Sequence, residues 1–226
     1  MKTMLVNNNL KKNFKYKTDG LQLLSKIEND SIATAFFDPQ YRGILDKLKY
    51  GNEGESRGKA RCDLIQMSEE IIVQFVNELS RVIKNSGHLF LWIDKFHLCS
   101  NFLTWFLNTK FNLVDLIVWD KDKIGMGYRS RRKSEYLAVF QKSPVRAKDC
   151  WTLHNIPDVW TEKISKEYKN HPHSKPIELQ KQLILATTKP GDIILDPAAG
   201  GFSVLTACQQ LEDRYFIGGD ILYGEN

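Results

Sequence analysis

Two hydrophobic runs, far apart in the chain, both end in the dipeptide Asp-Pro. Residues 32–37 lead into Asp38-Pro39, and residues 192–195 lead into Asp196-Pro197. A short apolar run bounded by turn residues is typical of a strand buried in a sheet. Ligands of open α/β sheets bind beyond the carboxyl ends of parallel strands. We therefore expect both Asp-Pro motifs at the ligand-binding edge of one sheet.

Strand and helix patterns alternate around these two runs, which predicts an α/β fold with a mostly parallel, doubly wound sheet. The clearest helix spans 69–84, where apolar residues recur at helical spacing, Ser68 can act as the N-cap and Asn85-Ser86-Gly87 ends the pattern. Residues 113–119 and 135–141 are expected to form an antiparallel hairpin at the sheet edge. Other expected elements are strands at 14–18, 88–93 and 215–219 and helices at 21–27, 98–107, 176–188 and 202–211.

The chain is long enough for a single core with one small insertion, because its 226 residues have the composition of a globular domain. We assign residues 1–141 and 174–226 to a catalytic and cofactor-binding core. Between them, in 142–173, the apolar periodicity fades and two tryptophans stand among polar residues, so this segment is the candidate for target recognition. Residues 45–64 are polar and contain three glycines, which predicts either a mobile loop or a surface insertion without a role.

The chain is modestly basic, with a formal net charge of +5 and a pI near 8.9, which is compatible with nucleic acid as a partner. Basic residues gather in two clusters that follow expected strands. Such runs are either solvated faces or phosphate contacts, and their place near the ligand-binding edge favours phosphate contacts. The clusters are Arg57, Lys59 and Arg61, and then Arg129, Arg131, Arg132 and Lys133 beside Tyr128.

Cysteine spacing bears on metal binding and on the cellular compartment. The four cysteines include no CxxC pair, which argues against a zinc site and a disulfide framework and predicts reduced thiols in a cytoplasmic protein. The first residues lack the pattern of a secretory signal, and no segment is apolar enough to predict a membrane span. Trp92, Trp105 and Trp119 are expected in the core.

Several short motifs resemble those of amino-methyltransferases, which transfer a methyl group from S-adenosylmethionine to exocyclic nitrogens of DNA bases. Asp38-Pro39-Gln40-Tyr41 resembles the catalytic motif D-P-P-Y, with Gln40 in place of the second Pro. Residues 196–202 resemble the cofactor turn D-P-F-x-G-S-G, with Ala198 in place of Phe and Phe202 in place of the last Gly. The catalytic motif comes first, which is the order of the β group. Further matches are Asp19, 171–176 with the pattern H-P-x-x-K-P, 119–121, 135–137 and 216–220.

The resemblance assigns the first motif to the methyl acceptor. Asp38 and the carbonyl of Pro39 would accept the two hydrogens of the target amino group, which directs the nitrogen at the methyl donor. Gln40 completes the motif, and Tyr41 would stack on a base turned out of the duplex. No covalent intermediate is required, and the chain lacks the Pro-Cys pair that methylation of a ring carbon uses.

The resemblance assigns the later motifs to the cofactor. Asp220 would bond the ribose hydroxyls, with Asp19 near the cofactor. Lys175, or the helix N-terminus beside it, would neutralise the cofactor carboxylate, and the alternative is an ordinary exposed lysine. The implied cofactor-binding residues are Asp19, Lys175, Pro176, Asp196, Pro197, Ala198, Gly200, Gly201 and Asp220. The implied DNA-contacting residues are Arg42, Arg129, Arg131, Arg132 and Lys133.

The implied function is sequence-specific methylation of the N6 amino group of adenine in double-stranded DNA, in a system with a cognate restriction endonuclease. Asp38 favours adenine, because family members that modify cytosine N4 more often carry Ser at that position. Methylation of cytosine N4, RNA or a protein amide stays open, as does a catalytically silent DNA-binding relative. A homodimer is compatible with the resemblance, and no membrane partner is expected.

Overall fold

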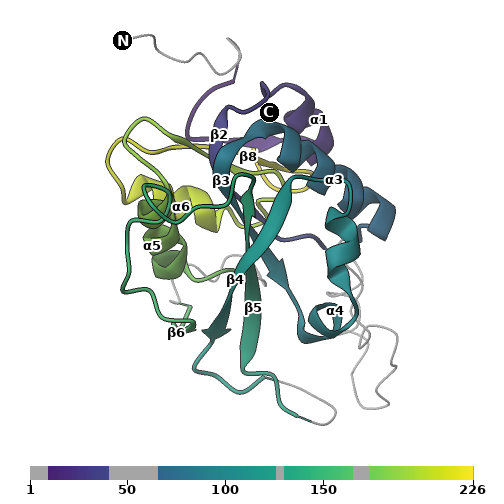
Figure 1. Cartoon of the computed structure of the whole chain (residues 1–226), viewed down its shortest axis with the longest axis vertical. Helices are drawn as coiled ribbons and strands as arrows, with labels where there is room; N and C mark the ends of the chain where they lie inside the picture. The colour runs from purple at the N-terminus through teal and green to yellow at the C-terminus, as the bar shows by residue number, and fades with distance from the viewer. Residues whose placement is uncertain (1–9, 41–65, 126–129, 165–173, 226) are drawn as a thin grey trace.

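The computed structural model describes residues 10–40, 66–125, 130–164 and 174–225, and a single sheet runs through the middle of them (Figure 1). Its strands are β1 (Phe14–Lys17), β2 (Ile32–Phe37), β3 (Ile83–Ile93), β4 (Phe111–Asp120), β5 (Ser134–Lys142), β6 (Val159–Thr161), β7 (Ile193–Asp196) and β8 (Tyr215–Asp220). The strand order is β1-β8-β7-β2-β3-β5-β4-β6. β5 is antiparallel to both neighbours, and every other pair within these ranges is parallel. The expected mostly parallel α/β sheet is therefore confirmed.

Helices cover both faces of the sheet (Figure 1). They are α1 (Gly20–Ser25), α3 (Glu69–Val82), α4 (Lys95–Cys99), the 3-10 helix η2 (Phe102–Phe106), α5 (Ile177–Thr187) and α6 (Ser203–Gln209). α1, α3 and η2 pack against one face, and α5 and α6 pack against the other. Side chains of a strand alternate between faces. In β2, Ala35 and Phe37 therefore join the first core cluster and Phe36 joins the second.

α3 forms where the helical spacing of apolar residues predicts it. The Oγ of Ser68 accepts a hydrogen bond from the N–H of Ile71 at 3.4 Å, and two acidic residues occupy the first turn. The expected end at residue 84 is wrong, because the helix ends at Val82 and β3 begins at Ile83 without a loop. Val82 and Ile83 are both fully buried, so packing rather than a turn signal sets this boundary.

The glycine expected to stop α3 instead lets two strands approach closely. Residues 84–87 lie in an irregular stretch of β3 beside β2. A Cβ added to Gly87 would lie 2.7 Å from the carbonyl oxygen of Ala33. Only glycine permits this approach of one backbone to another.

The expected helix at 98–107 is two short pieces in the structure. α4 is capped by Asp94, whose carboxylate accepts hydrogen bonds from the N–H groups of Phe96 and His97, each at 2.9 Å. Asn101 then adopts a left-handed conformation with φ of 58°, and η2 follows. A left-handed residue cannot continue a right-handed helix, which explains the break.

The hairpin of β4 and β5 is confirmed, but the edge of the sheet lies one strand further out. β6, from the segment 142–173, pairs in parallel with the end of β4. In the same segment Trp151 and Trp160 pack against the core cluster that α5 and α6 cover. The part of the segment that is described therefore contributes to the sheet and the core, and its role in target recognition stays a prediction.

Aromatic residues fill the core as expected, since Trp92, Trp105 and Trp119 are 2, 3 and 2 % exposed. Within the described ranges, no helix combines the length and the apolar character needed to span a bilayer. The same ranges contain no group of His, Cys, Asp and Glu side chains that could hold a metal ion.

Candidate active site

Acidic residues follow the strands at one edge of the sheet. Asp38 comes directly after β2, Asp196 and Asp220 end β7 and β8, and Asp19 lies two residues beyond β1. Since these four strands are parallel, their carboxyl ends meet at the same edge. β5 runs the other way, so Glu135 near its beginning reaches this edge as well. Sheet order thus brings together side chains that lie far apart in sequence.

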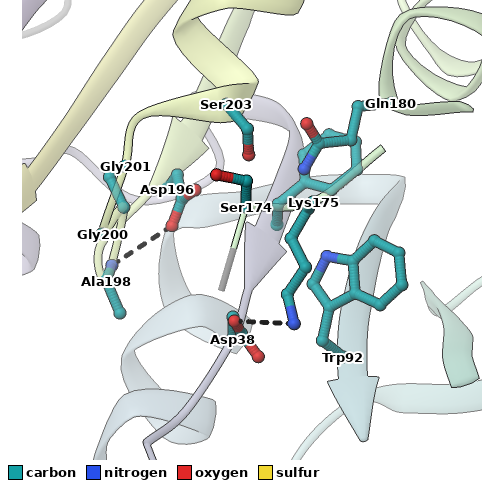
Figure 2. A pocket seen from close by; sticks show the side chains of 12 residues that line it. Asp38, Trp92, Ser174, Lys175, Gln180, Asp196, Ala198, Gly200, Gly201 and Ser203 are labelled. Carbon is teal, nitrogen blue, oxygen red and sulfur yellow. Dashed lines mark hydrogen bonds and ion pairs between the residues drawn. The ribbon is translucent and has the colours of Figure 1, made fainter. Parts of the chain in front are cut away.

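A pocket at this edge joins the two Asp-Pro motifs (Figure 2). It encloses about 360 Å³ of empty space, part of it open to solvent. Asp38 lines it from the end of β2, and Asp196, Gly200 and Gly201 line it from the turn after β7. β2 and β7 are neighbours in the sheet. The two motifs therefore face one space.

The first motif is only partly described. The Asp38 side chain is 34 % exposed, Pro39 is buried, and the carbonyl oxygen of Gln40 accepts a hydrogen bond from the N–H of Met67 at 2.7 Å. Tyr41 lies outside the described residues. The carboxylate that the sequence assigns to the acceptor is thus accessible from the pocket.

Two carboxylates hold the turn after β7. Oδ1 of Asp196 accepts a hydrogen bond from the N–H of Ala198, and Oδ2 of Asp220 accepts one from the N–H of Gly200, each at 3.2 Å. Pro197 within the turn is buried. Because one carboxylate comes from β7 and the other from β8, the turn is fixed against two strands.

Phe202 is where the turn departs most from the family pattern. Its φ is 56°, a conformation that favours the glycine found there in related enzymes. The ring is nevertheless buried, 3 % exposed, and lies edge-on to Phe216 with 6.2 Å between ring centroids. Burial of an aromatic side chain is worth about 1.5–3 kcal/mol, which offsets the backbone strain.

Asp196 is the most buried of these carboxylates, at 6 % exposed. Burial raises its pKa to about 8, and the negative charges of Asp38 and Asp220 act in the same direction. Both effects favour the protonated form of Asp196. A carboxyl group perturbed in this way, beside a pocket, is typical of a functional site.

Lys175 contacts the carboxylate of the first motif. Its Nζ lies 3.0 Å from Oδ2 of Asp38 and 2.9 Å from Oε2 of Glu135, with the centre of the Trp92 ring 4.9 Å away. Figure 2 shows the ammonium between Asp38 and the indole. The side chain is 11 % exposed, so the alternative of an ordinary exposed lysine is wrong. Two carboxylates already share its charge, and a contact with the cofactor stays a prediction.

Glu135 pairs with two lysines, which the sequence pattern did not indicate. Oε2 bonds to Lys175 and Oε1 bonds to Lys121. Burial alone would raise the pKa of Glu135, but the two lysines lower it to about 2. Burial alone would likewise lower the pKa of Lys175, but Asp38 and Glu135 raise it above the usual value for lysine. We call the row Lys121, Glu135, Lys175 and Asp38 the charge network.

Asp19 and Asp220 lie on the far side of the turn from Asp38 in the sheet order. Oδ1 of Asp19 caps α1, accepting from the N–H groups of Leu21 and Gln22 at 2.9 and 3.0 Å. Oδ1 of Asp220 accepts from two backbone N–H groups at 2.8 and 2.9 Å. Both carboxylates are therefore oriented by the backbone, and their contacts with a cofactor stay predictions.

The start of α5, next to Lys175, is held by a residue that sequence patterns missed. Pro176 is the N-cap and provides no side-chain acceptor. The carboxylate of Glu162 instead accepts from the N–H groups of Glu178 and Leu179, each at 3.0 Å. An acceptor at a helix N-terminus normally comes from the N-cap residue itself, so no local pattern could have indicated Glu162.

The basic turn between β4 and β5 is described only in part. Arg131, Arg132 and Lys133 are exposed, as phosphate contacts require. Nε of Arg131 donates to the carbonyl oxygen of Gly125 at 2.9 Å, and Lys133 pairs with Asp120 at 2.7 Å. Arg42, Arg129 and the segment 45–64 lie outside the described residues.

Two buried polar atoms in the pocket wall have no hydrogen-bond partner within the described part of the chain. They are Nε1 of Trp92 and Oε1 of Gln180, on residues 2 % and 1 % exposed. Buried polar groups without a partner are costly and need an explanation. One donor and one acceptor are thus available to a bound molecule.

Comparison with known proteins gives a consistent result. Residues 32–223 match the N6/N4 methyltransferase family, described as DNA methylase. Type II methyltransferase M.HhaII from Haemophilus parahaemolyticus is 58% identical over 215 residues, which cover 95% of this chain and 93% of that protein. DNA adenine methyltransferase YhdJ from Escherichia coli (strain K12) is 26% identical over 244 residues, covering 90% of this chain and 76% of that protein. The solved structure of PvuII DNA methyltransferase, named as cytosine-N4-specific, has a TM-score of 0.70 at 16% identity and covers 94% of this chain and 85% of its own.

Proposed function

The chain belongs to the DNA methylase family of N6 and N4 methyltransferases, and we propose that it methylates the N6 amino group of adenine in a short sequence of double-stranded DNA. The observation that carries the proposal is the pocket that Asp38 shares with the turn at 196–201. Asp38 offers an acceptor for amino hydrogens, and the glycine turn suits a nucleotide-like donor. Acceptor and donor would meet in one space.

S-adenosylmethionine is the methyl donor, and its sulfonium supplies an activated methyl group when bound. The chemistry of this edge of the sheet, in the pocket and beside it, fits the cofactor. Carboxylates at the ends of β1 and β8 suit ribose hydroxyls, and Trp92 and Gln180 offer one unpaired donor and one unpaired acceptor. We assign cofactor binding to Asp19, Pro176, Asp196, Pro197, Ala198, Gly200, Gly201 and Asp220, with Lys175 beside them.

The acceptor side works mainly by orientation. The adenine amino nitrogen is a weak nucleophile, because its lone pair is delocalised into the ring. Asp38 and the Pro39 carbonyl would accept its two hydrogens and favour a more tetrahedral nitrogen that points at the methyl donor. Transfer leaves an extra proton on that nitrogen, and we propose that Asp38 takes it. The target base must leave the duplex to reach this pocket, where we expect Tyr41 to stack on it.

The test is nucleoside analysis of duplex DNA incubated with the protein and S-adenosylmethionine labelled in its methyl group. We expect the label in N6-methyladenine, since Asp38 occupies the position where cytosine-N4 enzymes more often have Ser. Label in N4-methylcytosine would contradict the adenine assignment alone. Label only in RNA or protein would contradict DNA as the substrate, and a folded protein that binds DNA without any transfer would favour a silent relative.

The target sequence and the partners need a second measurement. Sequencing of DNA from a host that expresses the gene, with detection of modified bases, reports the base and its sequence context together. A single short motif methylated throughout is expected of the partner of a restriction endonuclease. Scattered methylation without a motif would contradict that role.

A further inference from the structure

The charge network extends from the pocket to the hairpin of β4 and β5. Asp38, Lys175, Glu135 and Lys121 alternate in charge, and each is joined to the next by an ion pair. Asp38 follows β2 and Lys175 precedes α5, whereas Lys121 directly follows β4 and Glu135 lies in β5. A change at one member therefore alters the electrostatic balance and the contacts of the next.

We propose that Glu135 is a positioning residue for methyl transfer, which acts on Asp38 by holding Lys175. The inference rests on the proposed function, since it concerns the same catalytic carboxylate. Glu135 itself has no assigned contact with the target base or the cofactor.

The geometry at Lys175 supports this role. A lysine ammonium is a compact charge on a flexible stem. With a single carboxylate partner, the side chain can form the ion pair in several conformations. Here Glu135 at 2.9 Å and the face of Trp92 at 4.9 Å restrain the Nζ that lies 3.0 Å from Asp38. The Oδ2 atom of Asp38 is held in place, while the carboxylate stays 34 % exposed toward the pocket.

Loss of one partner from an enclosed ion pair destabilises a protein, so the effect of Glu135 on folding has to be separated from its effect on methyl transfer. The start of α5 is already held by Glu162, through two hydrogen bonds of 3.0 Å. Glu135 is therefore not needed to anchor the helix, and its ion pairs are with the side chains of Lys121 and Lys175.

The experiment compares Glu135→Gln with a matched control, Asp30→Asn. Asp30 pairs at 2.7 Å with Lys142, whose side chain is 5 % exposed, and it lies before β2, whereas Asp38 follows β2. Both substitutions remove one carboxylate charge from an enclosed lysine and keep the side-chain shape. Asp30 has φ of 54°, a conformation that Asn tolerates.

The measurements are single-turnover methyl transfer at saturating cofactor and DNA, calorimetric binding of S-adenosylmethionine, and thermal unfolding. For Glu135→Gln we expect transfer to slow about 100-fold, the cost of a misplaced reacting group, with cofactor affinity within about threefold of wild type. Asp30→Asn should transfer at the wild-type rate even where it unfolds at a lower temperature. A normal rate in Glu135→Gln, or equal slowing in Asp30→Asn, would overturn the inference.

A double variant tests whether Glu135 acts through Lys175. In a Lys175→Met background, Glu135→Gln should slow transfer no further, because the link to Asp38 is already absent. A further loss of about tenfold or more in that background would contradict the route through Lys175. Where Lys175→Met does not fold, Glu135→Asp replaces it, and this variant should recover part of the rate lost in Glu135→Gln. A rate as low as that of Glu135→Gln would reject positioning by charge.

The wild type separates this inference from the proposed function. A wild type that transfers no methyl group to DNA would reject the proposed function, and the inference with it. An active wild type together with an active Glu135→Gln would reject the inference alone.

Discussion

Two enclosed lysines lie at opposite ends of the sheet, and their partners differ. Lys142 pairs with Asp30 at 2.7 Å and donates to the backbone carbonyl of Ile83 at 2.6 Å. Lys175 instead pairs with two carboxylates from different elements, one of which lines the pocket. A backbone partner ties the first lysine to the fold, whereas side-chain partners tie the second to a site. The partners, rather than burial, distinguish the two lysines.

The two ends of the sheet also differ in the titratable groups that they bury. His88 begins the regular pairing of β3 with β5, at the end where Lys142 lies, and burial lowers its pKa to about 4. It packs against Phe90 and Trp151 and is neutral at physiological pH. At the other end burial raises the pKa of Asp196 to about 8, which favours its protonated form. The buried imidazole at one end is kept neutral, whereas the other end arranges several carboxylates around a pocket.

The largest expected effect comes from replacing one Asp by Asn at each of the two ends of the sheet, Asp38 at one and Asp30 at the other. Asp38→Asn replaces an acceptor oxygen by an amide donor, so we expect single-turnover transfer to fall by at least about 100-fold with the fold intact. Asp30→Asn removes the charge of a largely exposed partner of Lys142, so we expect a loss of about 1 kcal/mol or less in unfolding free energy with normal transfer. Denaturant unfolding and transfer assays on both proteins check the contrast. If the two variants slowed methyl transfer equally, the proposed difference between Asp38 and Asp30 would be wrong.

The decrease of the unfolding free energy at acidic pH should depend on His88. Its pKa is lowered from 6.5 to about 4 in the folded protein, so between these values the unfolded chain binds a proton that the folded chain does not. Stability is therefore complete above pH 6.5 and should fall by about 3 kcal/mol as the pH drops to 4. His88→Phe should flatten this decline in urea unfolding measured at several pH values. An unchanged pH slope would show that other groups cause it.

A substitution at Glu162 tests whether the start of α5 is held independently of the charge network. Glu162→Ala removes the acceptor for two N–H groups of α5, so we expect a loss of about 1–2 kcal/mol in unfolding free energy. Glu178→Gln is the matched control on the same helix, since Glu178 makes an exposed pair with Lys181, and it should cost about 0.5 kcal/mol or less. Equal losses in chemical denaturation would argue against the capping role.

The smallest expected effect is on DNA affinity. Replacement of Arg131 and Arg132 by Ala should weaken DNA binding and reduce the slope of log affinity against log salt by about 1–2. Exposed Arg146 and Lys148 follow the carboxyl end of β5, where Lys142 lies, and their double Ala variant should leave the slope unchanged. Fluorescence titrations at several salt concentrations measure both. If the basic turn contacts no phosphate, both double variants will show the same slope of log affinity against log salt.

The sequence predicts the strands and the two motifs because both depend on local patterns. The apolar run of 32–37 and the Asp-Pro that follows it are enough to place Asp38 at the end of a strand. The order of strands in the sheet is not local. Contacts of Lys175 with Glu135 require that β5 reverse direction and lie beside β3, and no spacing between 135 and 175 indicates this.

The predicted ends of helices and turns are less accurate, because they also depend on contacts between distant residues. Asn85-Ser86-Gly87 is a sound stop signal for a helix, yet tertiary packing buries Val82 and Ile83 and ends the helix earlier. Phe202 likewise breaks the glycine pattern, and only the packing against Phe216 explains how the chain tolerates it. Sequence patterns give the elements, and the packing of one element on another decides where they end.

The reversed direction of β5 has a consequence for exchanging parts between relatives. The hairpin of β4 and β5 carries the exposed basic turn together with Lys121 and Glu135, which lie at the two ends of that turn. A graft of the whole hairpin would transfer the basic residues that we propose contact DNA and the support that we propose for Asp38 as one unit. A graft cut inside that unit would separate Lys121 from Glu135, so chimaeric enzymes should be joined outside 121–135.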